Sequence, residues 1–247
     1  MKSPVILVVR ADDQFSTLLR SSGCEVLNLE LISTAPSSNL TALDELLHRI
    51  DDYDGLFFTS PVSADVFVER SKAFVKSFLG KVYVLGRRAR TILEVAGFDV
   101  VFAGDANTAE EFIGSLEQTE FEGKRFLYVR GNKSLRTITN LLAGIAVVDE
   151  VTVYETKPMR TDNRIVGSVR KRLSDGEIEW VCFFSPSAVD SFCRLFPAEN
   201  LKRLKAAVIG ETTSRTARDR GMNVEFISVE ATADCFAAGL IGQINKH

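Results

Sequence analysis

The stretches FTSPVSADVF (residues 58–67) and FFSPSAVDSF (residues 183–192) decide the fold of this chain. Five of their ten positions are identical without a gap. Each stretch has the pattern of an apolar strand end, a Ser-Pro turn and a helix start, since serine is a preferred helix cap and proline suits the first helical turn. The chain therefore contains the same strand–turn–helix element twice.

The similarity between the two parts of the chain extends beyond these stretches. VYVLGRRARTILEVAGFDVVF (82–102) aligns with AAVIGETTSRTARDRGMNVEF (206–226), and TAEEFIGSL (108–116) aligns with TADCFAAGL (232–240), both at a spacing of 124. A period this long is a domain rather than a solenoid repeat, so we predict an internal duplication. VILVVR (5–10) also resembles RFLYVR (125–130), which shows that the duplication is not a simple tandem.

Short apolar runs alternate with helical patterns along the chain. In the helical pattern at 40–50, the apolar residues recur at the spacing of one helix face. Near-continuous apolar strands separated by helices predict parallel sheets covered on both faces, here two five-stranded, flavodoxin-like α/β domains. The expected strands are 5–9, 25–32, 55–59, 81–86, 99–103, 125–129, 147–155, 180–184, 206–210 and 224–228.

Two proline-containing segments, at about 33–38 and 155–161, follow long strands and have the composition of linkers. We expect residues 38–157 to form one domain, and residues 1–35 and 160–247 to close into the other. Two strands that cross between domains form a hinge. Hinged α/β domain pairs bind ligands in the cleft between them, so we expect a cleft site.

Composition excludes several classes of function. The formal charge of -3 and the pI of about 5.6 provide no global field that attracts nucleic acid. The chain has only two histidines, His48 and His247, which argues against a histidine-based zinc site and against Ser-His-Asp or Cys-His hydrolases. The four cysteines are scattered and contain no C-x-x-C pair, which is typical of free thiols in a reducing compartment.

The first apolar run, VILVV (5–9), is too short for a signal peptide or a membrane span. We therefore expect a cytoplasmic protein that binds neither membranes nor nucleic acid. No long apolar stripe is left unassigned, so we expect a monomer.

Five turns follow predicted strands and carry small residues, hydroxyls and free N–H groups at a helix start. At the carboxyl edge of a parallel sheet, such turns bind carboxylate or phosphate. Each turn by itself is also explained as an ordinary helix cap, but five of them together favour an anion-binding cleft. The turns are TSPVSA (59–64), GRRART (86–91), RGNKSLR (130–136), SPSAV (185–189) and GETTSR (210–215).

Arginine adds to this pattern, because Arg10 and Arg130 lie at equivalent strand ends and a guanidinium suits bidentate carboxylate binding. Nucleotide binding has little support, since no Walker lysine is present and GRRART lacks the G-x-G-x-x-G spacing. Tyr154 ends a long strand at the predicted hinge. Packing explains most such tyrosines, although a hydroxyl at this position would also reach a cleft.

Taken together, FxSPSxVxxF followed by AxIGxTTxxxAxxxG, with VYET (153–156) as a second marker, resembles the uroporphyrinogen-III synthase family of tetrapyrrole biosynthesis. The resemblance covers nearly the whole chain and implies two flavodoxin-like domains with parallel sheets, joined by a two-stranded hinge linker. It implies cyclisation of hydroxymethylbilane to uroporphyrinogen III, with inversion of the last pyrrole ring and loss of water. It implies no metal and no organic cofactor.

The resemblance places the family's tyrosine at Tyr154, as a weak donor to the leaving hydroxyl, and it matches Ser60, Ser185, Ser187, Thr212 and Thr213 to cleft positions. The full expected substrate-binding set adds the turn residues: Arg10, Thr59, Ser60, Gly86, Arg87, Arg130, Gly131, Asn132, Ser185, Ser187, Gly210, Thr212 and Thr213. The turn GRRART departs from relatives that have small hydroxylated residues there. A transient contact with hydroxymethylbilane synthase is a possible partner interaction, and a non-enzymatic hinged binding protein for an acidic small molecule is the alternative function.

Overall fold

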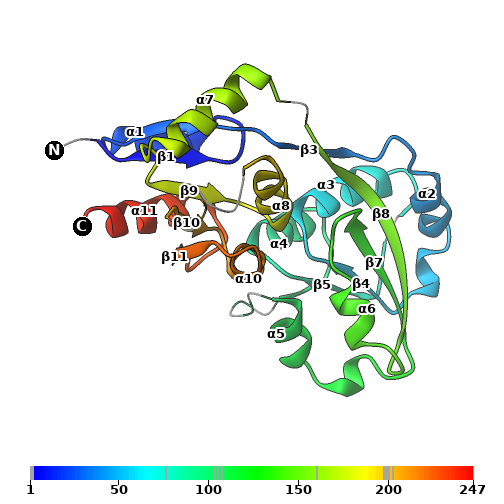
Figure 1. Ribbon diagram of the computed structural model, residues 1–247. Coiled ribbons are helices and arrows are strands. Elements are labelled where there is room, and N and C mark those ends of the chain that lie inside the picture. Colours follow the sequence, from blue (N-terminus) through cyan, green and yellow to red (C-terminus); the bar gives the residue numbers. More distant parts are fainter. Residues whose placement is uncertain are drawn as a thin grey trace. The chain divides into compact units, whose positions relative to one another are not determined.

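The structure is a computed structural model that describes residues 3–246 except 76, 103, 105, 107, 160, 197–200 and 202. Ala103, in the expected strand 99–103, and Arg160, in the expected linker 155–161, lie outside the described residues. The chain divides into two compact units (Figure 1). Unit 1 comprises Met1–Ser33 and Lys157–His247, and unit 2 comprises Thr34–Thr156.

Unit 1 contains a five-stranded sheet in the order β11-β10-β9-β1-β2, and every neighbouring pair is parallel. Numbered along the chain within this unit, the order is 2-1-3-4-5, which is the flavodoxin-like order. The central strands are buried along their whole length, as the apolar runs predict. The strands are β1 (Val5–Val8), β2 (Glu25–Asn28), β9 (Trp180–Phe183), β10 (Lys205–Val208) and β11 (Asn223–Ile227).

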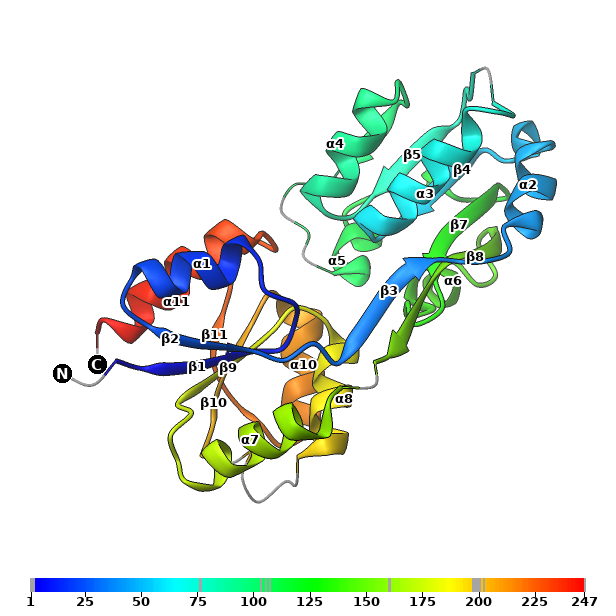
Figure 2. The same cartoon turned by 90° about the horizontal axis from the view of Figure 1, so that it is seen from above.

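Helices cover both faces of this sheet, so unit 1 has three layers (Figure 2). On one face lie α7 (Asn163–Ser174), α8 (Pro186–Leu195) and α10 (Glu211–Asp219). On the other face lie α1 (Gln14–Ser21) and α11 (Ala233–Ile244).

Unit 2 contains a six-stranded sheet in the order β3-β8-β7-β4-β5-β6. Its strands are β3 (Ile32–Pro36), β4 (Gly55–Phe58), β5 (Lys81–Val84), β6 (Val100–Phe102), β7 (Arg125–Gly131) and β8 (Val147–Pro158). One face is covered by α2 (Thr41–Leu47), α3 (Pro61–Ser71) and α4 (Arg87–Val95), and the other by α5 (Ala109–Gly114) and α6 (Thr137–Leu141). Two short 3-10 helices, η1 (Ile50–Asp52) and η2 (Gln118–Glu120), complete the unit.

The two sheets repeat one spatial arrangement. Apart from β3, the strands β8-β7-β4-β5-β6 of unit 2 lie in the same order as β2-β1-β9-β10-β11 of unit 1. Along the chain, however, unit 2 begins with the equivalent of β9 and ends with the equivalent of β2. The predicted duplication is therefore confirmed, and the two copies are circular permutations of each other.

The sixth strand of unit 2 differs from the expected pattern. The expected strand 25–32 is interrupted, because Leu29 and Leu31 turn into the core of unit 1. Pairing resumes at β3, where Ser37 N lies 2.9 Å from Val153 O and Met159 N lies 2.9 Å from Leu31 O. These partners run in opposite directions along the chain, so β3 is antiparallel to β8. The sheet of unit 2 consequently has six strands rather than the expected five.

The pairing of β7 with β8 shifts register at its carboxyl end, so that Gly131 lies opposite Tyr154. The Tyr154 ring packs directly on the backbone of Gly131. A Cβ added at residue 131 would lie 2.2 Å from Cζ of Tyr154. Glycine is therefore required at this position by the close approach of an aromatic ring.

We expect Gly131→Ala to lower the free energy of unfolding by about 1–3 kcal/mol, because the methyl group must displace the Tyr154 ring. Urea unfolding followed by circular dichroism measures the change. Gly167→Ala is the matched control, since no atom lies within 4 Å of a Cβ at this exposed helical position and alanine stabilises a helix. The penalty should disappear in a Tyr154→Ala background. An equally large penalty in that background would show that another contact causes it.

Candidate functional site

The expected turns lie at the carboxyl edge of each sheet, where parallel strands end and helices begin. In unit 1 the connections from β1 and β9 leave toward opposite sides of the sheet, and in unit 2 the connections from β7 and β4 do so. Such switch points are where open α/β sheets bind ligands, because no crossover helix covers them. Each unit therefore has one natural binding edge.

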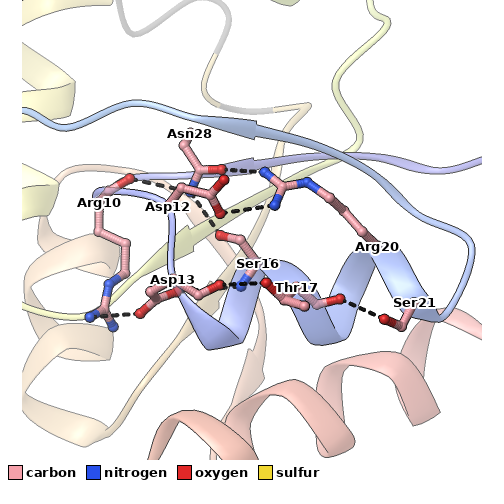
Figure 3. Close-up of polar contacts among 8 residues, drawn as sticks. All are labelled: Arg10, Asp12, Asp13, Ser16, Thr17, Arg20, Ser21 and Asn28. Carbon is pink, nitrogen blue, oxygen red and sulfur yellow. Dashed lines mark hydrogen bonds and ion pairs between the residues drawn. The ribbon is translucent and has the colours of Figure 1, made fainter.

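Arg10 lies at the switch point of unit 1, two residues after β1 (Figure 3). Its Nη2 is 2.9 Å from the Asp13 carboxylate, and its side chain is 37% exposed. Its Cζ also lies 4.3 Å from the centre of the Phe184 ring, which follows β9. The aromatic face and the single carboxylate hold the guanidinium in place and leave part of it accessible.

The backbone beneath Arg10 is held by a polar network that Figure 3 shows. Asn28 at the end of β2 donates from Nδ2 to Ser16 Oγ at 2.7 Å and to the carbonyl oxygen of Arg10 at 3.4 Å. Arg20 donates to Asn28 Oδ1 at 2.8 Å and to Asp12 at 2.9 Å. Asn28 contacts Arg10 only through its backbone carbonyl, and the guanidinium pairs with Asp13 instead.

The helices α8 and α10 follow β9 and β10, the two strands that come next to β1 in the sheet. Their first turns therefore lie at the same edge of the sheet as Arg10. Ser185 caps α8 by accepting from Ala188 N at 3.3 Å, and Ser187 is half-buried in the first turn. Gly210 precedes α10 in extended conformation, and Thr212 is half-buried. Thr213 is only 3% exposed, so its side chain belongs to the packed interior. The accessible polar groups at the start of α10 are therefore Thr212, the first-turn N–H groups and the Glu211 carboxylate, which is 40% exposed and disfavours a second anion there.

The corresponding turn of unit 2 carries a pair of hydroxyl groups. Ser60 caps α3 by accepting from Val62 N at 3.2 Å. Thr59 Oγ1 lies 2.8 Å from the phenolic oxygen of Tyr128 on β7. Tyr128 is 2% exposed, and this burial raises the pKa of its phenol above the ordinary value of 10.0. The Thr59 hydroxyl, by contrast, is on a half-buried residue.

Arg130, the equivalent of Arg10, has a different environment. Its side chain is 13% exposed, with Nη1 2.6 Å from Glu150 and Nη2 donating to the carbonyl of Ser134. Burial opposes ionisation of Glu150, but hydrogen bonds from Thr139, Arg130 and Arg136 outweigh it and lower the pKa of this carboxyl. Arg130 Nε has no hydrogen-bond partner among the described residues. Arg130 thus holds β7, β8 and the turn together.

One residue of the neighbouring strand explains the difference between the two arginines. Asn28 lies opposite Val8, and Glu150 lies opposite Tyr128, so both occupy the same position of the duplicated sheet. The carboxylate of Glu150 pairs with Arg130, whereas the neutral Asn28 contacts only the backbone of Arg10. The guanidinium of unit 1 therefore remains at the surface.

The end of β8 is held by Asn132. Its Oδ1 accepts from Thr156 N at 2.9 Å, and its backbone N donates to Tyr154 O at 3.1 Å. Tyr154 is half-buried, and no described residue forms a hydrogen bond with its hydroxyl. An oxygen that takes up a proton or a hydrogen bond from Tyr154 would thus displace no described partner.

The turn after β5 is more open. Gly86 precedes α4 with φ of 96°, a left-handed conformation that favours glycine. Arg87, the first residue of α4, is exposed.

The structure brings the expected residues into two groups, one in each unit. In unit 1 the strands β1, β9 and β10 are followed by Arg10, Ser185, Ser187, Gly210 and Thr212. In unit 2, Thr59 and Ser60 follow β4, Arg130 and Gly131 end β7, Asn132 follows it, and Tyr154 lies within β8, while Gly86 and Arg87 follow β5. Asp13, Asn28, Tyr128, Glu150 and Phe184 were not among the expected residues, although each contacts one of them. Comparison of equivalent positions in the duplication was the signal that would have found the strand residues.

No group of three or more His, Cys, Asp or Glu side chains suited to a metal ion was found among the described residues. A search of the described helices found none with the length and apolar character needed to cross a membrane.

Comparison with known proteins identifies the family. The family model described as "Uroporphyrinogen-III synthase HemD" matches residues 13–238. A uroporphyrinogen-III synthase of Chlorobaculum parvum is 28% identical over 197 residues, which cover 76% of this chain and 78% of the relative. One of Synechococcus elongatus is 27% identical over 244 residues, which cover 93% of this chain and 91% of the relative.

Solved structures agree with this match at the level of the fold. A mutant uroporphyrinogen III synthase of the extremely thermophilic bacterium Thermus thermophilus superposes with a TM-score of 0.74 at 18% identity, covering 99% of this chain and 100% of the other. The enzyme of Helicobacter pylori 26695 superposes with a TM-score of 0.58 at 18% identity, covering 98% and 100%. Because the family model spans most of the chain, from the start of α1 into α11, this chain belongs to the uroporphyrinogen-III synthase family.

Proposed function

We propose that this chain is a uroporphyrinogen-III synthase, a lyase that cyclises hydroxymethylbilane to uroporphyrinogen III with inversion of the last pyrrole ring and loss of water. The observation that carries the proposal is the family match over residues 13–238. The cytoplasmic location, the monomeric state and a transient contact with hydroxymethylbilane synthase remain predictions.

The chemistry of the two binding edges supports this substrate. Hydroxymethylbilane carries eight carboxylates, and Arg10 presents a partly exposed guanidinium in unit 1. The starts of α3 and α8, whose first turns carry no acidic residue, supply N–H groups and the positive end of the helix dipole, which favour anions without a net positive charge. Thr59, Ser187 and Thr212 add half-buried hydroxyl-bearing side chains.

In the reaction, departure of the terminal hydroxyl as water leaves an electrophilic azafulvene. The substituted carbon of the last ring attacks it to form a spiro intermediate, which fragments and closes again as isomer III. Without enzyme the substrate closes to the uninverted isomer I. The protein therefore acts mainly by holding the linear substrate in the conformation that leads to inversion of the last ring. Tyr154 assists by donating a hydrogen bond to the leaving hydroxyl.

The activity is tested by product analysis. Hydroxymethylbilane is generated fresh by a hydroxymethylbilane synthase and incubated with the protein, and the oxidised uroporphyrins are separated by chromatography. We expect isomer III in large excess over isomer I. Isomer I alone, from protein whose circular dichroism shows it folded, would exclude the synthase and favour a non-enzymatic binding protein for an acidic small molecule.

We expect Tyr154→Phe to lower kcat by about tenfold to a hundredfold, because a phenol is a weak donor and general acids contribute at most about 10⁴-fold. The ring and its packing on Gly131 are retained, so the unfolding free energy should change little. Tyr53→Phe is the matched control, since it removes a phenol that donates to Asp149 at 2.8 Å, away from the turns. A wild-type kcat for Tyr154→Phe would remove Tyr154 from the mechanism.

We expect Arg10→Ala to raise KM by about tenfold. This factor corresponds to ~1.5 kcal/mol of binding free energy, which is the contribution of one hydrogen bond to a charged group. Steady-state kinetics measure the change. Lys171→Ala removes the same charge from the last turn of α7, where Lys171 is 80% exposed and pairs with Asp175, and should leave KM unchanged. Equal effects of the two variants would indicate that only the net charge of the protein matters.

A further inference from the structure

The pair formed by Thr59 and Tyr128 has a defined direction. The distance of 2.8 Å between the two oxygens is compatible with either residue as the donor. However, Tyr128 is 2% exposed, and Thr59 is the only hydrogen-bond partner of its hydroxyl among the described residues. If Thr59 donated, the phenolic proton would be buried without an acceptor, which costs about 1–3 kcal/mol. Tyr128 is therefore the donor and Thr59 the acceptor.

This direction leaves the proton of Thr59 free. No other hydrogen bond of the Thr59 hydroxyl is present among the described residues, and Thr59 is half-buried rather than enclosed. Its O–H group therefore points away from Tyr128. A hydroxyl that accepts one hydrogen bond becomes a stronger donor in the next, because chains of hydrogen bonds polarise one another.

The protonation state of Tyr128 agrees with this role. Burial raises the pKa of the phenol and outweighs the nearby Arg130, which lowers it. The nearby side chains of Tyr154 and Glu150 act in the same direction as burial. Tyr128 consequently remains a neutral donor at neutral pH.

Unit 1 lacks this pair. The position of Thr59 is occupied there by Phe184, and that of Tyr128 by Val8. Phe184 instead lies beneath the guanidinium of Arg10. At equivalent switch points, unit 1 thus has the Arg10 guanidinium over an aromatic ring, and unit 2 has the Thr59 hydroxyl bonded to the phenol of Tyr128. Both groups suit an anionic oxygen.

We propose that Tyr128 is a positioning residue, which donates to Thr59 and thereby directs the Thr59 proton toward a carboxylate of the substrate. This inference rests on the proposed function, because it assumes an octacarboxylate ligand. Tyr128 itself does not touch the substrate.

The test is a double-mutant cycle read out by binding. The dissociation constant of uroporphyrin III, a stable octacarboxylate, is measured by quenching of Trp180 fluorescence, and kcat is measured in parallel. We expect Tyr128→Phe to weaken binding about fivefold and Thr59→Val about tenfold. The double variant should also bind about tenfold more weakly, because Tyr128 acts only through Thr59. Thr59→Ser keeps the hydroxyl and should restore binding close to the wild-type value.

Tyr83→Phe is the matched control. Tyr83 is also 2% exposed, lies in the same aromatic core and pairs with Phe57 from the other side of β4, but its hydroxyl donates to Glu120 at 3.1 Å instead of to Thr59. We expect it to leave binding unchanged, and the kcat of Tyr128→Phe to change less than its dissociation constant.

Effects that multiply to about fiftyfold in the double variant would overturn the inference, since independent contributions add in free energy. Equal weakening by Tyr83→Phe, or wild-type binding by Tyr128→Phe, would also overturn it. The proposed function is judged separately, by whether the wild-type protein forms isomer III. The binding cycle keeps its meaning if that activity is absent.

Discussion

The parallel pairing of β1 with β9, and of β7 with β4, is the constraint on which both binding edges depend. At each pair the following connections diverge, so the strand ends are not covered by a crossover helix. Each of these strands leads, directly or through a turn, into a helix, and the first N–H groups of a helix have no partner within it. Polar side chains at the strand ends are thus gathered at one edge of each sheet, above a core that is mainly apolar.

The two copies of the domain have diverged in chemistry while keeping this frame. At one equivalent position, unit 1 has Asn28 and unit 2 has Glu150. Because of this difference Arg10 lies at the surface, whereas Arg130 is mostly buried. At a second equivalent position, unit 1 has the aromatic ring of Phe184 and unit 2 has the hydroxyl of Thr59. A flexible substrate with many carboxylates, whose two ends must close in one of two ways, benefits from such unequal contacts, because they distinguish one end from the other.

The residues available at these edges suit a reaction controlled by conformation. They are mainly hydroxyls, backbone amides and arginine, the Asp13 carboxylate is paired with Arg10, and burial raises the pKa of the Tyr128 phenol. None is a strong acid or base near neutral pH. A substrate that cyclises spontaneously needs positioning more than proton transfer, and preorganised groups supply positioning at little cost.

The sequence by itself determined the fold class and the internal duplication, since strand and helix periodicities and the caps Ser60 and Ser185 are local patterns. It also located the turns of the candidate site. Only the tertiary structure showed that β3 pairs antiparallel to β8, that Thr213 is packed inside, and that Arg10 and Arg130 differ. The partners that separate the two arginines come from a neighbouring strand. Local pattern decides where a strand ends, but strand register and sheet order, which arise from long-range contacts, decide which side chains meet there.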